Sequence, residues 1–67
     1  MLDKEDIPRF RAEAKMFRAH AKAARAEMAK CKVAGDWVGK LKAECRVYEY
    51  VRDAQARDNW IKDLQAH

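Results

Sequence analysis

The stretch CKVAGDWVGKL, residues 31–41, holds both glycines of the 67-residue chain and separates two long segments with helical patterning. Gly35 can adopt the left-handed backbone conformation that ends an α-helix, and Asp36 can cap the N-terminus of the next helix. We therefore predict a turn at residues 34–36 with a helix on each side. The second helix is weakened at its start by Gly39.

The segment before the turn, residues 7–33, has the pattern of one long helix. Apolar side chains recur at alternating spacings of three and four, as in the seam of a coiled coil. They are Ile7, Phe10, Ala14, Phe17, Ala21, Ala24, Met28 and Cys31. Pro8 is tolerated in a first helical turn, and Asp6 is the expected cap.

The segment after the turn, residues 37–65, carries two apolar stripes, of which a hairpin can bury only one. The longer stripe consists of Ala43, Val47, Tyr50, Ala54, Arg57, Ile61 and Leu64. Folding back about Gly35 sets its large side chains opposite small ones of the first helix, so we expect this stripe to be the buried seam. Arg57 is the one discordant member, with a side chain long enough to reach outward.

The charges beside the seam favour the same antiparallel register. This register places opposite charges side by side at Arg18–Asp58, Lys32–Glu44, His20–Asp53 and Glu27–Arg46. Exposed pairs of this kind select register more than they stabilise the fold. The sequence thus predicts one all-α domain over residues 1–67, a two-helix antiparallel hairpin with coiled-coil-like packing.

The shorter stripe of the second helix is left without cover by this hairpin. It consists of Trp37, Val38, Leu41, Cys45 and Tyr48. Exposed apolar patches usually mark interaction sites, so these five residues are the candidate protein interface. A line of small side chains also runs along the first helix outside its seam: Ala12, Met16, Ala19, Ala23 and Ala26. Two hairpins could bury both surfaces, which predicts a homodimer built as a four-helix bundle.

The sequence argues against catalysis, metal binding and cofactors. Cys31, Cys45, His20 and His67 lack metal-ligand spacing, and no glycine-rich phosphate loop is present. A two-helix chain offers no dry pocket for a small-molecule substrate. No run approaches the ~18 apolar residues of a membrane span, no signal peptide is expected, and two cysteines fit a reducing compartment. We therefore expect a cytoplasmic, non-enzymatic protein.

The net charge of +4 is concentrated in the first helix, where residues 9–32 carry eight Lys or Arg and two Glu. Basic side chains with the same three–four spacing line one edge of this helix: Arg11, Lys15, Arg18, Lys22, Arg25 and Lys32. Such an edge can contact several phosphates of RNA or DNA. A solvated charged face is the simpler explanation of the same pattern.

Two interpretations of function follow. The first is a small regulator or inhibitor, of the kind that phages and mobile elements encode, which binds a protein through the shorter apolar stripe. The alternative is a dimeric RNA- or DNA-binding hairpin that uses the basic edge. The layout of such a dimer is similar to the small RNA-binding plasmid copy-number regulators of the Rop type, a resemblance of architecture only.

Overall fold

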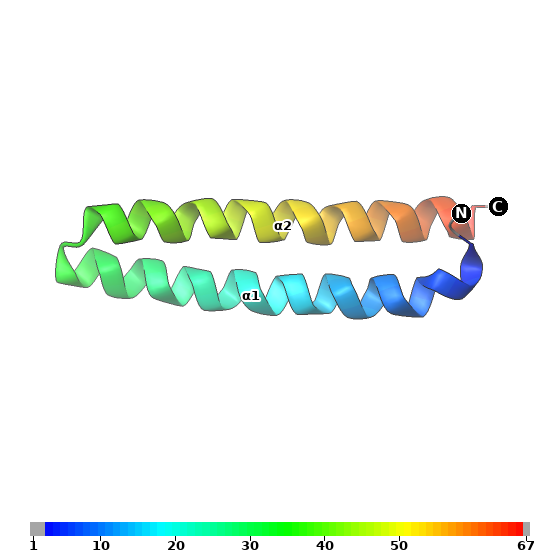
Figure 1. The fold of residues 1–67 in the computed structure, drawn as a ribbon, viewed down its shortest axis with the longest axis horizontal. Coiled ribbons are helices and arrows are strands. Elements are labelled where there is room, and N and C mark those ends of the chain that lie inside the picture. Colours follow the sequence, from blue (N-terminus) through cyan, green and yellow to red (C-terminus); the bar gives the residue numbers. More distant parts are fainter. Residues whose placement is uncertain (1–2, 67) are drawn as a thin grey trace.

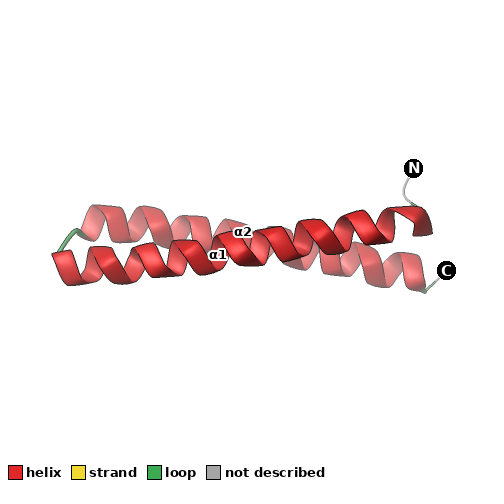
Figure 2. Cartoon of the chain, turned by 90° about the horizontal axis from the view of Figure 1, so that it is seen from below, coloured by secondary structure: helices red, strands yellow, loops and turns green. Residues whose placement is uncertain are grey.

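The computed structural model describes residues 3–66, which form two antiparallel helices joined by a two-residue turn (Figure 1). A 3₁₀ turn, η1 (Lys4–Asp6), leads into α1 (Ile7–Ala34), and α2 (Trp37–Gln65) returns along the length of α1. The helices cross at a shallow angle, and the molecule is a rod of 49 × 16 × 14 Å (Figure 2). For these residues the predicted all-helical hairpin is confirmed.

Backbone and side-chain hydrogen bonds at the turn end α1 and begin α2. Gly35 has a left-handed backbone, with φ of 74°, and its N–H donates to the Lys32 carbonyl at 3.2 Å. The Asp36 N–H donates to the Cys31 carbonyl at 2.8 Å, which completes a Schellman motif. Oδ1 of Asp36 then accepts the Gly39 N–H at 2.9 Å and caps α2. Only two residues therefore lie between the helices, and α1 ends one residue later than the sequence pattern indicates.

The N-terminus of α1 is capped differently from the prediction. Asp6 precedes α1, but its side chain makes no hydrogen bond to that helix. Its carboxylate accepts the Asp3 N–H at 3.0 Å, while the Asp3 carboxylate accepts the Glu5 N–H at 2.8 Å. Asp6 thus occupies the predicted N-cap position of α1, but its side chain does not cap that helix, because a capping box around η1 uses its carboxylate.

The core is a narrow seam between α1 and α2. Its buried members are Phe10, Ala14, Ala21, Ala24 and Cys31 from α1, and Ala43, Ala54 and Ile61 from α2. Alanine at five of these eight positions lets the two backbones approach closely. The other seam positions predicted from the spacing are half-buried, and among them the rings of Phe17 and Tyr50 stack with centroids 6.5 Å apart. The longer stripe of α2 is thus the one that faces α1.

Arg57, the discordant member of the seam, is held against α1. Its Nε donates to Oε2 of Glu13 at 2.9 Å. Its guanidinium lies over the rings of Phe17 and Trp60, 5.2 and 4.5 Å from their centroids. Trp60 meets Phe10 edge to face, with centroids 5.2 Å apart. Although its side chain is long enough to reach outward, an ion pair and two cation–π contacts hold Arg57 in the seam.

One of the four predicted cross-helix ion pairs forms, between Arg18 and Asp58. Three do not form within residues 3–66: Lys32–Glu44, His20–Asp53 and Glu27–Arg46. His20 instead lies on the ring of Tyr50, with centroids 5.2 Å apart. An exposed ion pair contributes only about 0.2–1 kcal/mol, so a competing contact is enough to replace it.

Gly39→Ala is expected to destabilise the hairpin, although alanine is the better helix former. A Cβ at this position would overlap Oδ2 of Asp36 and would lie 2.9 Å from Sγ of Cys31. Relieving this overlap displaces the Asp36 cap, so we expect a net loss of roughly 1 kcal/mol in the free energy of unfolding. Urea denaturation followed by circular dichroism measures it. In a Cys31→Ala background the loss should be smaller, and a higher urea midpoint for Gly39→Ala alone would contradict the packing described here.

Candidate protein-interaction surface

The five residues of the shorter apolar stripe, here called the α2 stripe, are all exposed. They are Trp37, Val38, Leu41, Cys45 and Tyr48, and the exposed fractions of the four largest are 60%, 64%, 58% and 79% in the order Trp37, Val38, Leu41, Tyr48. Val51, at 44%, continues the same side of α2 toward its C-terminus. Because α2 faces α1 with the longer seam, these side chains share an exposed side of the rod, where Nζ of Lys40 lies over the Trp37 ring at 5.7 Å from its centroid.

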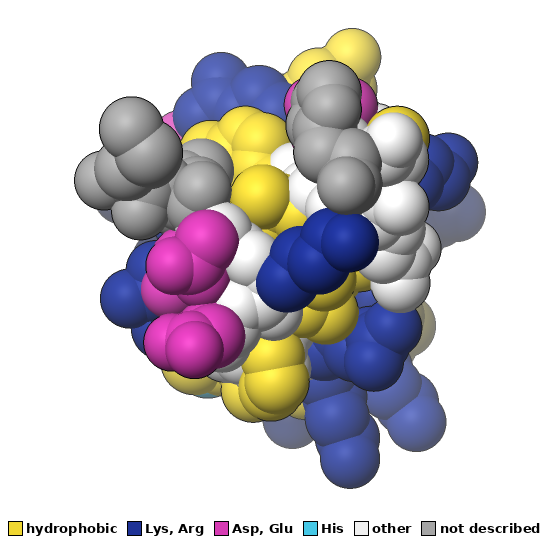
Figure 3. Space-filling model, turned by 90° about the vertical axis from the view of Figure 1, so that its right-hand side faces the viewer, with side chains coloured by type: hydrophobic (Ala, Val, Ile, Leu, Met, Phe, Trp, Pro, Cys, Tyr) yellow, Lys and Arg dark blue, Asp and Glu magenta, His cyan; other side chains and the backbone are white. Residues whose placement is uncertain are grey.

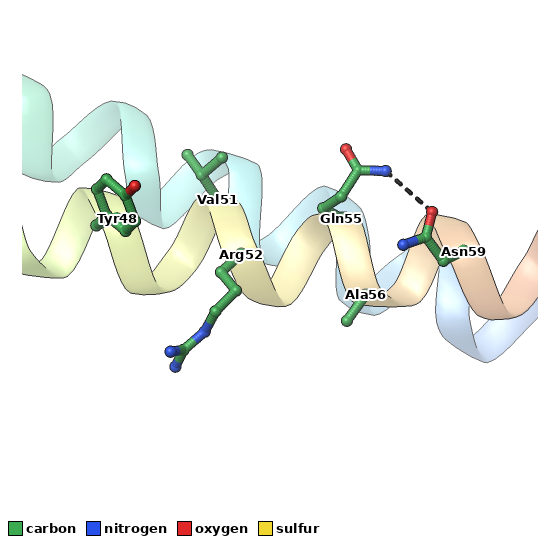
Figure 4. A pocket seen from close by; sticks show the side chains of 6 residues that line it. All are labelled: Tyr48, Val51, Arg52, Gln55, Ala56 and Asn59. Carbon is green, nitrogen blue, oxygen red and sulfur yellow. Dashed lines mark hydrogen bonds between the residues drawn. The ribbon is translucent and has the colours of Figure 1, made fainter.

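A shallow hollow lies at the end of the α2 stripe. It is lined by Tyr48, Val51, Arg52, Gln55, Ala56 and Asn59 (Figure 4). The small Ala56 side chain leaves space between its larger neighbours, and Nε2 of Gln55 donates to Oδ1 of Asn59 at 3.1 Å along one wall. Of the residues that line it, only Tyr48 was predicted from the sequence to belong to an interface. The sequence signal for it is that Val51 and Ala56 follow Tyr48 by three and eight residues. These spacings extend the apolar side of α2 by about two turns.

The basic edge of α1 lies beside the α2 stripe. Its five candidate phosphate-binding residues are exposed: Arg11, Lys15, Arg18, Lys22 and Arg25. Arg18 and Arg25 line a second hollow together with Val51 and Gln55 of α2, and Val51 and Gln55 also border the first hollow. The two candidate surfaces are therefore adjacent. Arg18 is partly committed, because it pairs with Asp58.

The acidic side chains of α1 lie on its other edge. Glu13 binds Arg57, and Glu27 accepts a weak hydrogen bond from Sγ of Cys31 at 3.9 Å. Each of these glutamates directly precedes a seam residue, whereas Arg18 and Arg25 each directly follow one. In a heptad these two kinds of position lie on opposite sides of the seam, so the glutamates lie across α1 from the two arginines. At the end that carries the termini, acidic side chains gather on the left, while Lys and Arg side chains lie at the lower right and also at the top and left (Figure 3). On α1, the edge with Arg18 and Arg25 is thus the basic one, and the edge with Glu13 and Glu27 is the more acidic one.

Trp60, the second tryptophan, was assigned no role from the sequence. It is 37% exposed, and its ring contacts Phe10 and the Arg57 guanidinium. Trp60 lies three residues after Arg57, on the side of α2 that meets α1, and not on the α2 stripe. Trp60 therefore belongs to the packing between the helices, and Trp37 is the tryptophan available for binding.

The two cysteines have different surroundings. Cys45 is exposed on the α2 stripe, whereas Cys31 is buried beneath the turn. Burial raises the pKa of the Cys31 thiol, and the carboxylates of Asp36 and Glu27 raise it further. The thiolate is the form that attacks electrophiles and binds metals, so Cys31 acts as a small apolar side chain at neutral pH. Within residues 3–66, no three His, Cys, Asp or Glu side chains are grouped as they would be around a metal ion.

Neither described helix combines the length and apolar character needed to cross a membrane. Comparison with protein-family models, with curated proteins and with solved structures gives no match for this chain. The α2 stripe and the basic edge are the two prominent features of the described surface.

Leu41→Asp is expected to leave the hairpin folded, whereas Ala43→Asp should unfold it. Leu41 is 58% exposed and Ala43 only 1% exposed, so the same carboxylate is solvated at one position and buried at the other. We expect a change below about 1 kcal/mol for Leu41→Asp and a loss of about 3 kcal/mol or more for Ala43→Asp. Thermal melts followed by circular dichroism compare the two. Equal destabilisation would mean that the α2 stripe is part of the core.

Proposed function

We propose that this chain is a non-enzymatic interaction protein that binds a protein partner through the α2 stripe and so acts as a small regulator or inhibitor. The observation that carries the proposal is the exposure of Trp37, Leu41 and Tyr48 on one side of a helix whose other side is already packed. Apolar side chains that a fold leaves in contact with water are the usual anchors of a protein interface.

The energetics support a binding role for these side chains. Full burial of a large apolar side chain is worth about 1.5–3 kcal/mol relative to leaving it in water. The hairpin itself does not gain this energy from Trp37, Leu41 or Tyr48, each of which is more than half exposed. A partner that covers all three would gain it, and the two aromatic rings offer a large contact area at little conformational cost.

Nucleic-acid binding is the second candidate function, and the exposure of the basic edge favours it. Replacing Lys15 and Lys22 with Glu should abolish binding of a single-stranded 20-nucleotide RNA, because both side chains lie on that edge. The matched control replaces Lys30 and Lys42, which lie off the edge, and changes the net charge equally. The association constant of the native chain for this RNA should fall steeply with salt. The slope of its logarithm against the logarithm of the salt concentration should be about −0.7 for each phosphate contacted. Equal loss in both double variants, or binding that persists in strong salt, would contradict this function.

Photocrosslinking in the cell that produces the chain tests the proposed function directly. A photoreactive phenylalanine analogue in place of Tyr48, which is 79% exposed, should yield a discrete adduct with another protein. The same analogue in place of Arg46, exposed on the other edge of α2, is the control and should yield none.

The identity of the adduct separates the alternatives. A protease-sensitive adduct with a different protein supports the proposal. An adduct of two copies supports the four-helix homodimer expected from the sequence, in which each copy covers the α2 stripe of the other. A nuclease-sensitive adduct supports the second candidate function, and equal crosslinking from both positions would contradict a specific partner of any class.

A further inference from the structure

We infer that the partner is an acidic amphipathic helix that lies along the α2 stripe and turns its carboxylates toward the basic edge of α1. This inference rests on the proposed function and names the chemistry of the protein that would bind. Three features of the described surface carry it: the geometry of the hollow, the charge beside it, and the length of the apolar side of α2.

The hollow at the end of the α2 stripe has the geometry of a helix-binding site. Its lining falls into two overlapping groups with the spacing i, i+3, i+4, i+7: Tyr48, Val51, Arg52 and Gln55, then Arg52, Gln55, Ala56 and Asn59. In coiled coils, four residues with this spacing form the hole that receives one side chain of the facing helix. Two holes in succession along α2 therefore fit two consecutive seam residues of a partner helix.

The apolar side of α2 is long enough for a partner helix of several turns. Trp37, Leu41, Tyr48, Val51 and Gln55 follow one another at spacings of three, four or seven residues. At about 1.5 Å per residue, the distance from Trp37 to Gln55 is roughly 27 Å, or about five helical turns. A third helix can follow this line and pack against both members of the hairpin, because the second hollow opens between α1 and α2.

The charge beside the α2 stripe selects an acidic partner. Arg18 and Arg25 line the second hollow together with Val51 and Gln55. Val51 and Gln55 also line the hollow at the end of the α2 stripe, so a helix seated in that hollow passes next to the two guanidinium groups. Within residues 3–66, Asp58 is the only carboxylate in an ion pair with the basic edge, and it pairs with Arg18. Carboxylates on one flank of the partner would meet unpaired basic groups, which strengthens attraction and fixes orientation.

The same charge disfavours a second copy of this chain as the occupant. A two-fold axis sets a surface patch against its own equivalent, so each basic edge would enter an interface that contains the other. The chain carries a net charge of +4, and two like charges at 4 Å repel by about 1 kcal/mol even in water. An acidic helix is attracted by the same basic side chains that would repel a second copy of this chain.

The make-up of the α2 stripe also favours a helix over a nucleic-acid strand. Proteins bind single strands by stacking successive bases on aromatic side chains. Here Trp37 and Tyr48 are eleven residues apart, and the side chains between them on the stripe are Val38, Leu41 and Cys45. Aliphatic side chains at helical spacing match the seam of another helix.

Selection from a displayed peptide library tests the inference. The library consists of 28-residue helices with leucine at the two seam positions of each heptad and random residues at the two flanking positions. We expect selection on the full chain to enrich Asp and Glu on one flank. An enriched peptide should bind at least about ten-fold more weakly to Leu41→Asp and to the double variant Lys22→Glu, Arg25→Glu, and should bind Lys30→Glu, the matched control off the edge, as it binds the native chain.

The other outcomes overturn the inference in distinguishable ways. Enriched peptides that need Leu41 but carry neutral or basic flanks would remove the acidic partner and leave the proposed function standing. No enrichment, or enriched peptides indifferent to Leu41→Asp, would overturn both. A salt-independent dimer by light scattering that Leu41→Asp dissociates would identify a second copy as the occupant. A 20-nucleotide RNA that binds more tightly than the selected peptides, and whose binding is lost in the double variant but kept in Leu41→Asp, would identify nucleic acid as the partner.

Discussion

Two packed helices can cover only one side of each other, and the arrangement of this protein depends on that constraint. α2 has apolar side chains on two sides, and α1 can bury only one of them. The longer seam is buried because it meets α1 over seven heptad positions, with alanine opposite larger groups along much of its length. The exposure of the α2 stripe follows from its exclusion.

The turn enforces the choice between the two sides. With only Gly35 and Asp36 between the helices, the last turn of α1 and the first turn of α2 have little freedom to rotate against each other. Gly39 brings the first turn of α2 close to Cys31, since a Cβ there would overlap both Sγ of Cys31 and the Asp36 carboxylate. Gly39 has a low helix propensity, but its lack of a side chain lets the first turn of α2 pack closely against Cys31. This close packing fixes the register of the two helices.

Arg57 shows how much of the packing was open to prediction from the sequence. Its position in the seam followed from spacing alone, but its conformation did not. Glu13 and Phe17 of α1 and Trp60 of α2 surround it. Contacts between long side chains depend on rotamers that heptad spacing does not specify, which is also why three of the four predicted ion pairs do not form.

The sequence by itself determined the two helices, the turn, the buried seam and the exposure of the α2 stripe, because each depends on spacing along one chain and on the conformational preferences of glycine and aspartate. Only the tertiary structure decided that the α2 stripe and the basic edge lie on the same side of the rod, meeting at Val51, Gln55, Arg18 and Arg25. The physical reason is that adjacency across two helices depends on their rotation and separation, and here the turn and the alanine seam set both.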